Sequence, residues 1–298
     1  MPARYAKPPA ETGPAETAPP DWSLPREDLT RRAGARSPGD GAALVAEGFR
    51  PPPHERAQSG AARLRVFLRR LADLQFGSIW RDLARLLPEA RGTFADVGCG
   101  AQPFRDLLRP EVRYIAVDTE DAESRFGYRA ADTRLYRGAV LPLGDGEADT
   151  VLCTETLEHV LETMPFLREL RRVLAPGGRL ILTVPFAARW HFVPQDYWRF
   201  TPSGLAYLLA QAGFCEIRIY ARGGALAVAG YKALGLVLLL LAGYGYRGIA
   251  GALPRLLGAG LLPLGLLAAL VGHIGLMFPG TAEDTLGYTV LARTGGSQ

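Results

Sequence analysis

The chain has 298 residues, and its 34 lysines and arginines against 30 aspartates and glutamates give a formal net charge of +4. Because this charge is modest and the arginines are scattered along the chain, the sequence does not favour a nucleic-acid partner. A hydrophobic content of 48% is enough for the core of one large domain or two small ones. The three cysteines lie in apolar, strand-like stretches without metal-ligand spacing, which indicates buried thiols in a reducing cytosol.

Residues 1–58 are rich in proline, alanine, glycine and charge. Such a composition buries too little apolar surface to offset the entropy cost of ordering, so we expect a disordered tail. The tail contains no apolar run typical of a signal peptide. Apolar residues then recur at helical spacing between positions 64 and 87, which predicts one or two amphipathic helices before the first strand.

Residues 93–100, Thr-Phe-Ala-Asp-Val-Gly-Cys-Gly, predict a short buried strand that ends in a glycine turn. The glycines permit positive φ angles and leave the backbone bare, so a ligand could lie against it. Pro103 stands where a helix could begin, and residues 104–108 continue with helical spacing. A strand, a glycine turn and a helix N-terminus together predict a nucleotide-type pocket at the carboxyl edge of a parallel sheet.

A second strand ends in an acid. Residues 114–118, Tyr-Ile-Ala-Val-Asp, place Asp118 about twenty residues after the glycines, as a ribose contact requires. The third glycine of a dinucleotide fingerprint is absent, because Ala101, Gln102 and Pro103 occupy that region. This departure weakens an assignment to NAD or FAD binding.

The motif at residues 96–100 resembles the first motif of class I S-adenosylmethionine-dependent methyltransferases, and Asp118 resembles their ribose-binding acid. Residues 149–160 and 170–180 are similar, in order and spacing, to motifs of the type 11 methyltransferases. The resemblance covers about residues 90–221 and a short piece near the C-terminus. It implies an α/β fold with a Rossmann-like, seven-stranded, doubly wound sheet whose last strand is antiparallel. It also implies S-adenosylmethionine as the cofactor, bound by Asp96, Gly98, Cys99, Gly100 and Asp118.

The resemblance further implies that Thr154 and Glu155, at the carboxyl end of the fourth strand, line the methionine end of the cofactor. Structural capping by Glu158 and His159 is the alternative for this region. Glu155 and His159 are four residues apart and could share a helical face, but no further ligand lies nearby in the sequence, so we expect no metal site.

The adenine contact is left open. In many relatives it is an acid four residues before a Leu-Pro pair, and Arg137 occupies that position here. Asp132 is a weaker substitute, and a solvated loop is the alternative. In relatives the helical segment before the first strand often covers the cofactor site, whereas simple packing on the sheet explains residues 64–87 equally well.

Residues 164–174 predict an amphipathic helix, and residues 180–184 the fifth strand. The loop that follows, residues 186–200, is rich in aromatic and charged side chains at the expected ligand-facing edge. His191 is our first choice for a general base and Asp196 our second. Trp190, Tyr197 and Arg199 would clamp the acceptor. An aromatic lid that only packs against the sheet is the alternative.

A further helix begins near Thr201, and residues 214–220 alternate as a sixth strand. The last strand is delayed to residues 286–293, after a hydrophobic helical insertion. We therefore divide the chain into a disordered tail (1–58), a methyltransferase domain (59–222), an insertion (223–283) and the final strand with its tail (284–298).

The insertion is apolar over residues 225–246, apart from Lys232, and residues 256–278 carry no formal charge and are long enough to span a bilayer. Because both flanking strands belong to one sheet, the insertion leaves and returns on the same side of any membrane. Two full spans would place Arg247 and Arg255 on the far side, which the positive-inside rule disfavours. We therefore expect a re-entrant or in-plane hairpin over residues 224–279. A buried helical pair or a dimer interface is the alternative.

Together these patterns predict a methyltransferase at the cytoplasmic face of a membrane, with a small-molecule, lipid or lipid-linked glycan acceptor. A non-catalytic membrane-associated binding module with the same fold is the second hypothesis. A nicotinamide-dependent oxidoreductase is a third, which the Pro-Gly-Gly motif at 176–178 and the Leu-Glu-His motif at 157–159 disfavour.

Overall fold

The computed structural model of the chain describes residues 56, 59–127, 130–191, 195–243, 248–278 and 283–296, and all of them belong to one compact unit. The tail predicted for residues 1–58 lies outside the described residues, apart from Arg56. Arg247, which entered the membrane argument, lies outside them as well.

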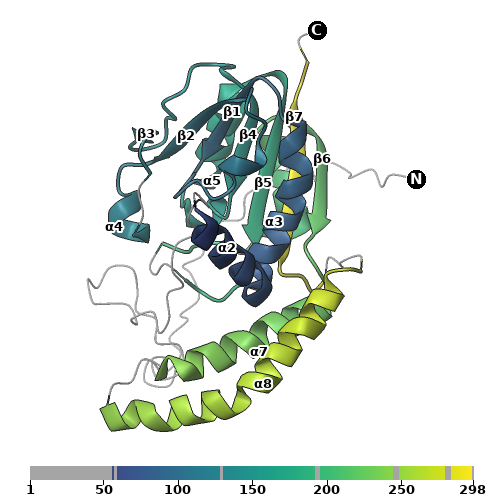
Figure 1. Cartoon of the computed structure of the whole chain (residues 1–298). Helices are drawn as coiled ribbons and strands as arrows, with labels where there is room; N and C mark the ends of the chain where they lie inside the picture. Colours follow the sequence, from purple (N-terminus) through teal and green to yellow (C-terminus); the bar gives the residue numbers. More distant parts are fainter. Residues whose placement is uncertain are drawn as a thin grey trace, which may run out of the picture. The chain divides into compact units, whose positions relative to one another are not determined.

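The described strands form one seven-stranded sheet in the order β3-β2-β1-β4-β5-β7-β6 (Figure 1). Every neighbouring pair is parallel except the two that involve β7, which runs antiparallel to β5 and β6. The predicted doubly wound sheet with an antiparallel last strand is thereby confirmed. Its strands are β1 (Thr93–Val97), β2 (Arg113–Thr119), β3 (Thr133–Tyr136), β4 (Ala148–Thr154), β5 (Leu174–Pro185), β6 (Phe214–Ala221) and β7 (Gly287–Thr294).

Helices cover both faces of the sheet, because its central strands are apolar on both sides. Within β4, Val151 and Cys153 join one buried cluster with α5 and α6, while Leu152 joins a second cluster with α3. This alternation follows from the two-residue period of a strand. The α-helices among the described residues are α2 (Gly60–Ala72), α3 (Leu74–Leu86), α4 (Ala122–Phe126), α5 (Thr163–Val173), α6 (Pro202–Gln211), α7 (Ala225–Leu241) and α8 (Ala252–Gly275).

Two local expectations are wrong. The helix expected after Pro103 is only a 3-10 turn at Arg105–Leu107, because Leu108 is already extended and Pro110 prevents continuation. Glu155 and His159 do not share a helical face, since only Leu157–His159 form a 3-10 turn there. The sequence also gave no signal for β3, a half-buried strand of four residues at the edge of the sheet.

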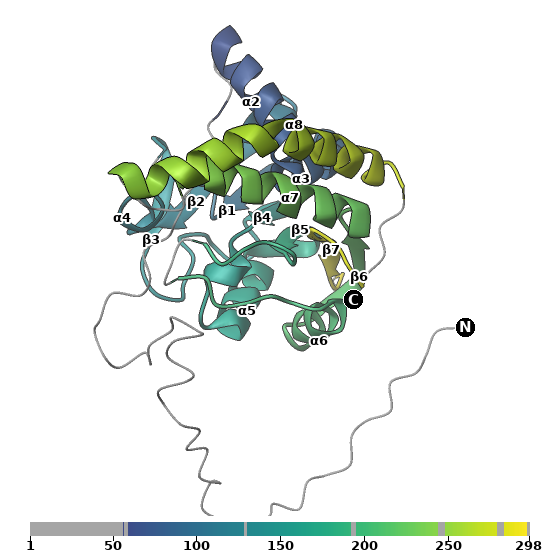
Figure 2. The same cartoon turned by 90° about the horizontal axis from the view of Figure 1, so that it is seen from below.

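The insertion forms an antiparallel hairpin of α7 and α8, which lie side by side in both views and below the sheet in Figure 1 (Figures 1 and 2). It leaves β6 and returns to β7 at the carboxyl edge of the parallel strands. Glycines allow the two helices to approach closely: a Cβ at Gly230 would lie 2.4 Å from the Ala268 carbonyl oxygen, and one at Gly258 would lie 2.8 Å from the Leu241 nitrogen. An apolar helical insertion before the last strand is thereby confirmed.

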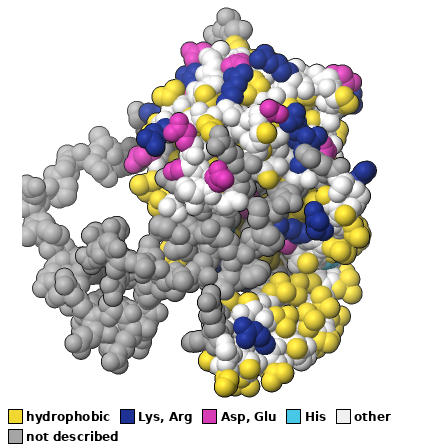
Figure 3. Space-filling view, turned by 60° about the vertical axis from the view of Figure 1, so that its left-hand side comes forward, with side chains coloured by type: hydrophobic (Ala, Val, Ile, Leu, Met, Phe, Trp, Pro, Cys, Tyr) yellow, Lys and Arg dark blue, Asp and Glu magenta, His cyan; other side chains and the backbone are white. Residues whose placement is uncertain are grey.

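Much of the hairpin surface is apolar. Residues 248–275 contain an 18-residue window with a mean hydropathy of 1.9, and the segment is long and apolar enough to cross a membrane. The core helix of a soluble protein also passes this test. Only 22% of the most apolar window is buried, however, which is little for a core helix. Figure 3 shows the hydrophobic side chains gathered over this end of the molecule. Exposed large side chains of α8 include Leu253, Leu256, Leu264, Leu267 and Leu270.

Candidate active site

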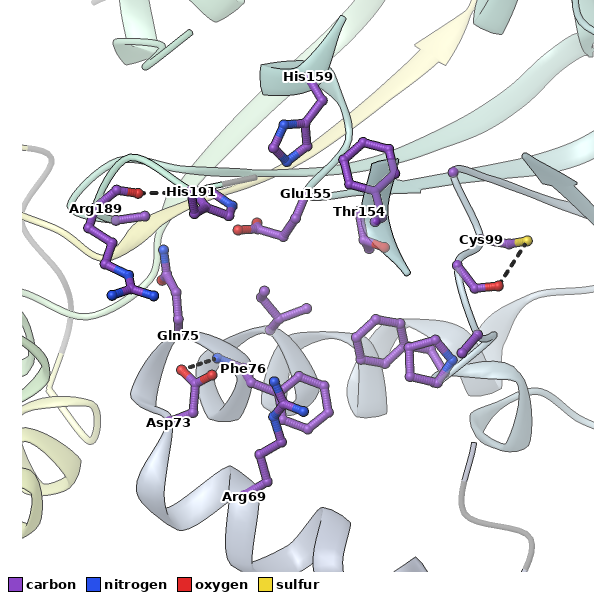
Figure 4. A pocket seen from close by; sticks show the side chains of 18 of the residues that line it. Arg69, Asp73, Gln75, Phe76, Cys99, Thr154, Glu155, His159, Arg189 and His191 are labelled. Atoms are coloured by element: carbon purple, nitrogen blue, oxygen red, sulfur yellow. Dashed lines mark hydrogen bonds between the residues drawn. The ribbon is translucent and has the colours of Figure 1, made fainter. Parts of the chain in front are cut away.

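A cavity of about 190 Å³ lies at the carboxyl edge of the sheet. Figure 4 shows Glu155 and His159 on one side of it, and Arg69, Asp73 and Phe76 on the opposite side. Its walls therefore come from the ends of β1 and β4, the loop after β5, the α2–α3 junction and α7. The lining residues used below are Arg69, Asp73, Phe76, Gly98, Cys99, Gly100, Thr154, Glu155, His159, Arg189, His191 and Tyr231.

The glycine turn after β1 lies at one end of this cavity. The amides of Gly98 and Cys99 donate to the carbonyl of Val117, which fixes the turn against β2. Gly98 has a φ of 75°, and a Cβ there would lie 2.2 Å from Thr156 Oγ1. Only glycine meets both demands, so the turn presents backbone to the cavity as the sequence predicted. Contact of Gly98, Cys99 and Gly100 with a cofactor stays a prediction.

Asp118 ends β2 beside this turn. Its carboxylate accepts hydrogen bonds of 2.8 Å from the amides of Gly100 and Thr119. Asp118 lines a small recess of about 10 Å³, and Gly100 lines both this recess and the main cavity. Burial raises the pKa of this carboxyl, while the two amide hydrogen bonds oppose that effect. A ribose bound across Gly100 would meet this carboxylate, as the sequence predicted.

The sequence predicted Asp96 as a cofactor contact, but its side chain lies away from the cavity surface. It is buried beneath the turn, where one carboxylate oxygen accepts a 2.7 Å hydrogen bond from the Tyr114 hydroxyl. Its other oxygen has no hydrogen-bond partner among the described residues. Burial raises the pKa of Asp96 to about 7. Asp96 is not among the residues that line the cavity.

Glu155 is fixed at the cavity wall by a residue that the sequence did not single out. Its Oε1 accepts hydrogen bonds from Thr183 Oγ1 at 2.9 Å and from Arg222 at 2.8 Å. Arg222 is fully buried and also donates to the Val184 carbonyl at 3.0 Å. A buried guanidinium therefore balances the carboxylate that faces the cavity. In the sequence, Arg222 is notable only as a charged residue between the sixth strand and a long apolar segment.

The loop after β5 is organised around Asp196, whose side chain is fully buried. Arg199 binds both of its carboxylate oxygens, at 2.5 and 2.7 Å. His191 Nδ1 lies 3.0 Å from Asp196 Oδ2 and 3.0 Å from the Arg189 carbonyl oxygen. Burial opposes ionisation of Asp196, but the hydrogen bonds from Arg199 and His191 outweigh it and lower the pKa of the carboxyl. Asp196 thus positions His191, and only His191 lines the cavity.

The predicted acceptor clamp is arranged differently from our expectation. Trp190, Tyr197 and Arg199 are not among the lining residues, and Arg189 lines the cavity instead. The Trp190 indole donates to the Asp196 carbonyl at 3.0 Å, which ties it to the loop itself. A role of the three residues in acceptor binding stays a prediction.

A cluster of Glu158, His159 and His191 lies next to the cavity. The His159 Nδ1 donates to the Gln195 carbonyl at 2.6 Å, and its ring lies 5.2 Å from that of His191. Glu158 is fully buried, and neither of its carboxylate oxygens has a hydrogen-bond partner within the described part of the chain. One ligand atom from each of the three residues lies within 4.8 Å of the other two, so the group could hold a metal ion. In the sequence, only Glu155 and His159 suggested a possible ligand pair, and the expectation of no metal site stays a prediction.

The α2–α3 junction forms the wall opposite the sheet. Asp73 caps α3 by accepting from the Phe76 amide at 3.2 Å, and Arg69 lies over the Phe76 ring at 5.8 Å. The segment packs on the sheet and also lines the cavity. That it covers a bound cofactor stays a prediction. Arg137, in contrast, is exposed and pairs with Glu120 at 3.3 Å, and the adenine contact stays open.

Residues 95–182 match the model of a type 11 family described as "Methyltransferase domain". A probable S-adenosylmethionine-dependent methyltransferase of Mycobacterium tuberculosis is 32% identical over 186 residues, which cover 56% of this chain and 66% of that protein. An uncharacterized 37.1 kDa transposon protein of Streptomyces fradiae is 35% identical over 114 residues, 34% of this chain and 32% of that protein. The chain thus spans less than two thirds of these curated relatives. A solved methyltransferase from Archaeoglobus fulgidus has a TM-score of 0.43 and 15% identity, over 73% of this chain and 92% of its own.

Proposed function

We propose that this chain, a member of the class I S-adenosylmethionine-dependent methyltransferases of the type 11-like group, methylates a lipid or lipid-linked acceptor at a membrane surface. The observation that carries the acceptor class is the position of the cavity. It lies between the glycine turn and Tyr231 of α7, so the apolar hairpin forms part of the acceptor site. A small soluble acceptor is the other outcome that the experiment below distinguishes.

The charged and apolar groups of the site suit S-adenosylmethionine. The glycine turn offers bare backbone, and Asp118 offers a carboxylate for ribose hydroxyls. The methionine end of the cofactor carries an ammonium and a carboxylate group, and the cavity wall carries both acidic and basic side chains. When bound, the cofactor supplies an electrophilic methyl group on a sulfonium. Asp73 and Glu155 are the acids and Arg69 and Arg189 the bases of this wall.

The chain's own contribution to the reaction is positioning with modest acid–base help. The acceptor hydroxyl would lie beside His191 and give its proton to the imidazole as the oxygen attacks. Because Nδ1 of His191 lies 3.0 Å from both Asp196 Oδ2 and the Arg189 carbonyl, these groups hold the proton on Nδ1. Nε2 is then the proton acceptor. Asp196 orients the ring, in the manner of a triad acid.

The hairpin would anchor this site to the cytoplasmic face of the membrane. Both of its ends join the same edge of one sheet, so an in-plane or re-entrant arrangement keeps the sheet on one side. Between residues 223 and 278 the sequence contains no aspartate or glutamate, and Lys232, Arg247 and Arg255 are its lysine and arginine residues. A positively charged, apolar surface favours the anionic cytoplasmic leaflet.

The test is methyl transfer from radiolabelled S-adenosylmethionine to lipid and to water-soluble extracts of the same cells. We expect label in the lipid fraction, and loss of that label with His191→Gln. Label only in the soluble fraction would contradict the acceptor class. Cofactor binding without transfer to either fraction would support the non-catalytic binding module instead.

A further inference from the structure

Helix α2 carries an apolar surface that faces away from the protein. Leu64, Phe67, Leu68 and Leu71 are 58%, 52%, 53% and 47% exposed. Their spacing at 3.6 residues per turn places them in one stripe along the helix. Ala62 and Val66 occupy the opposite side, where Ala62 is buried and Val66 packs against the core cluster with α3. The inner side of α2 therefore packs on the protein, and the apolar stripe on its outer side is exposed.

Two exposed arginines border this stripe. By the same helical geometry, Arg63 lies along one side of it and Arg65 along the other. Arg69 and Arg70 instead lie over the rings of Phe76 and Trp80 in α3. The sequence of α2, GAARLRVFLRRLA, contains no acidic residue. A narrow apolar face with basic side chains on both sides is the pattern of a helix that lies in the plane of a membrane interface. Arginine stems can cover apolar surface while their charged ends reach lipid phosphates.

The stripe meets the apolar surface of the hairpin. His273 of α8 donates from Nε2 to the Leu71 carbonyl at 2.7 Å, so the last turn of α2 lies against α8. Val271 and Ile274, on either side of His273, are themselves exposed. Figure 2 shows α2 extending outward next to α8.

We propose that α2 is a second membrane-binding element, which lies in the interface of an anionic bilayer with its apolar stripe among the acyl chains. This inference rests on the proposed function, in which the hairpin binds the same bilayer. Charge complementarity favours an anionic bilayer as the occupant. The stripe is bordered by Arg63 and Arg65 and adjoins a hairpin without acidic residues, which suits anionic phosphate groups. A second copy of this chain would instead place arginines opposite arginines if α2 met α2.

The position of α2 links the membrane to the cavity. Arg69 lies in α2, Asp73 is the first residue after this helix, and both residues line the cavity. Tyr231 of α7 lines it as well. The cavity wall is therefore built from the two elements that would contact lipid, and an acceptor in the bilayer would lie next to the site.

The test measures sedimentation of the full chain with vesicles of phosphatidylcholine alone or mixed with phosphatidylglycerol. We expect Phe67→Glu/Leu68→Glu to weaken binding to the mixed vesicles by about tenfold or more, because two charges would enter the apolar interface. Arg63→Ala/Arg65→Ala should remove most of the preference for phosphatidylglycerol, while binding to phosphatidylcholine stays unchanged. The matched control is Val140→Glu/Tyr207→Glu, at residues 66% and 65% exposed outside α2 and the hairpin, which should bind as wild type.

Three outcomes would overturn the proposal. Unchanged vesicle binding by Phe67→Glu/Leu68→Glu, when Leu266→Glu/Leu270→Glu in α8 abolishes it, would leave the hairpin as the membrane contact and remove α2. A wild-type dimer that Phe67→Glu/Leu68→Glu converts to a monomer without loss of vesicle binding would assign the stripe to a second copy. No vesicle binding by wild type would refute both membrane proposals. Binding of S-adenosylhomocysteine shows in each case that the variant is folded, because neither Phe67 nor Leu68 lines the cavity.

Discussion

Arg222 donates a 2.8 Å hydrogen bond to Glu155 from a fully buried position directly after β6. The pair joins the start of the apolar insertion to the carboxyl end of β4 and holds an acid at the cavity wall. Removing one partner of a buried pair leaves an uncompensated charge, which is far more costly than losing an exposed pair.

Arg222→Met should lower the free energy of unfolding by about 3–5 kcal/mol, as measured by urea denaturation. The matched control is Arg293→Met, because Arg293 pairs with Glu216 at 3.6 Å with both side chains exposed. That variant should change the free energy by at most about 1 kcal/mol. Equal effects of the two variants would show that the Arg222–Glu155 pair has no special structural role.

Gly98→Ala should be more destabilising than Gly138→Ala. Both glycines have left-handed φ angles, 75° and 81°, so alanine is strained by about 1–2 kcal/mol at either position. A Cβ at Gly98 additionally meets Thr156, whereas nothing lies within 4 Å at Gly138. Comparison of the two unfolding free energies isolates the steric term, and similar values would mean that the turn can move away from β4.

The buried Asp96 makes stability depend on pH. Its pKa is about 7 in the folded protein, above the ordinary value of an aspartate. The native state therefore binds the proton more tightly than the unfolded state, and the stabilisation is complete below about pH 4. It is lost as the pH rises to about 7, by roughly 4 kcal/mol for a shift of this size.

Asp96→Asn should abolish this pH dependence, because the amide resembles the protonated acid. Urea denaturation from pH 4 to 8 should give similar values for both proteins at the acidic end and a more stable variant at pH 8. A variant less stable than wild type at pH 8 would mean that the charged form is the one that the fold favours.

Asp196→Asn tests the positioning of His191. We expect the turnover rate to fall by roughly tenfold or more, with little change in S-adenosylhomocysteine affinity, since Asp196 does not line the cavity. His191→Gln should lose about 100-fold or more, and the double variant should be no worse than His191→Gln alone. Additive losses would indicate that the two residues act independently.

Chelation distinguishes an imidazole base from a metal-bound one. If His191 accepts the proton directly, dialysis against a chelator should leave methyl transfer unchanged. Loss of activity that a divalent cation restores would assign Glu158, His159 and His191 to a metal centre, as their spacing permits.

The sequence predicted most of the sheet, because each central strand is a continuous apolar run with a turn signal at its end. It also located the glycine turn and Asp118, whose functional meaning depends on local spacing. It missed β3, since four half-buried residues at a sheet edge give almost no periodic signal. It placed Arg189 in the polar loop after the fifth strand without a role of its own. It missed Arg222 and Tyr231, which reach the site from separate elements, because only the fold brings them together.

The loop after β5 shows the same limit. Its composition indicated a polar cluster at the carboxyl edge of the sheet. In the fold, however, Asp196 and Arg199 pair with each other within the loop, and neither lines the cavity. Residue types alone do not reveal which charged groups neutralise each other.

Binding of S-adenosylmethionine by the glycine turn and Asp118 is tested most directly by calorimetric titration with S-adenosylhomocysteine. We expect binding in the micromolar range by wild type, weakened about 10- to 100-fold in Asp118→Ala, as the loss of charge-assisted hydrogen bonds to ribose requires. Circular dichroism would confirm that the variant is folded. A folded wild type that does not bind, or an Asp118→Ala variant that binds equally well, would contradict the account.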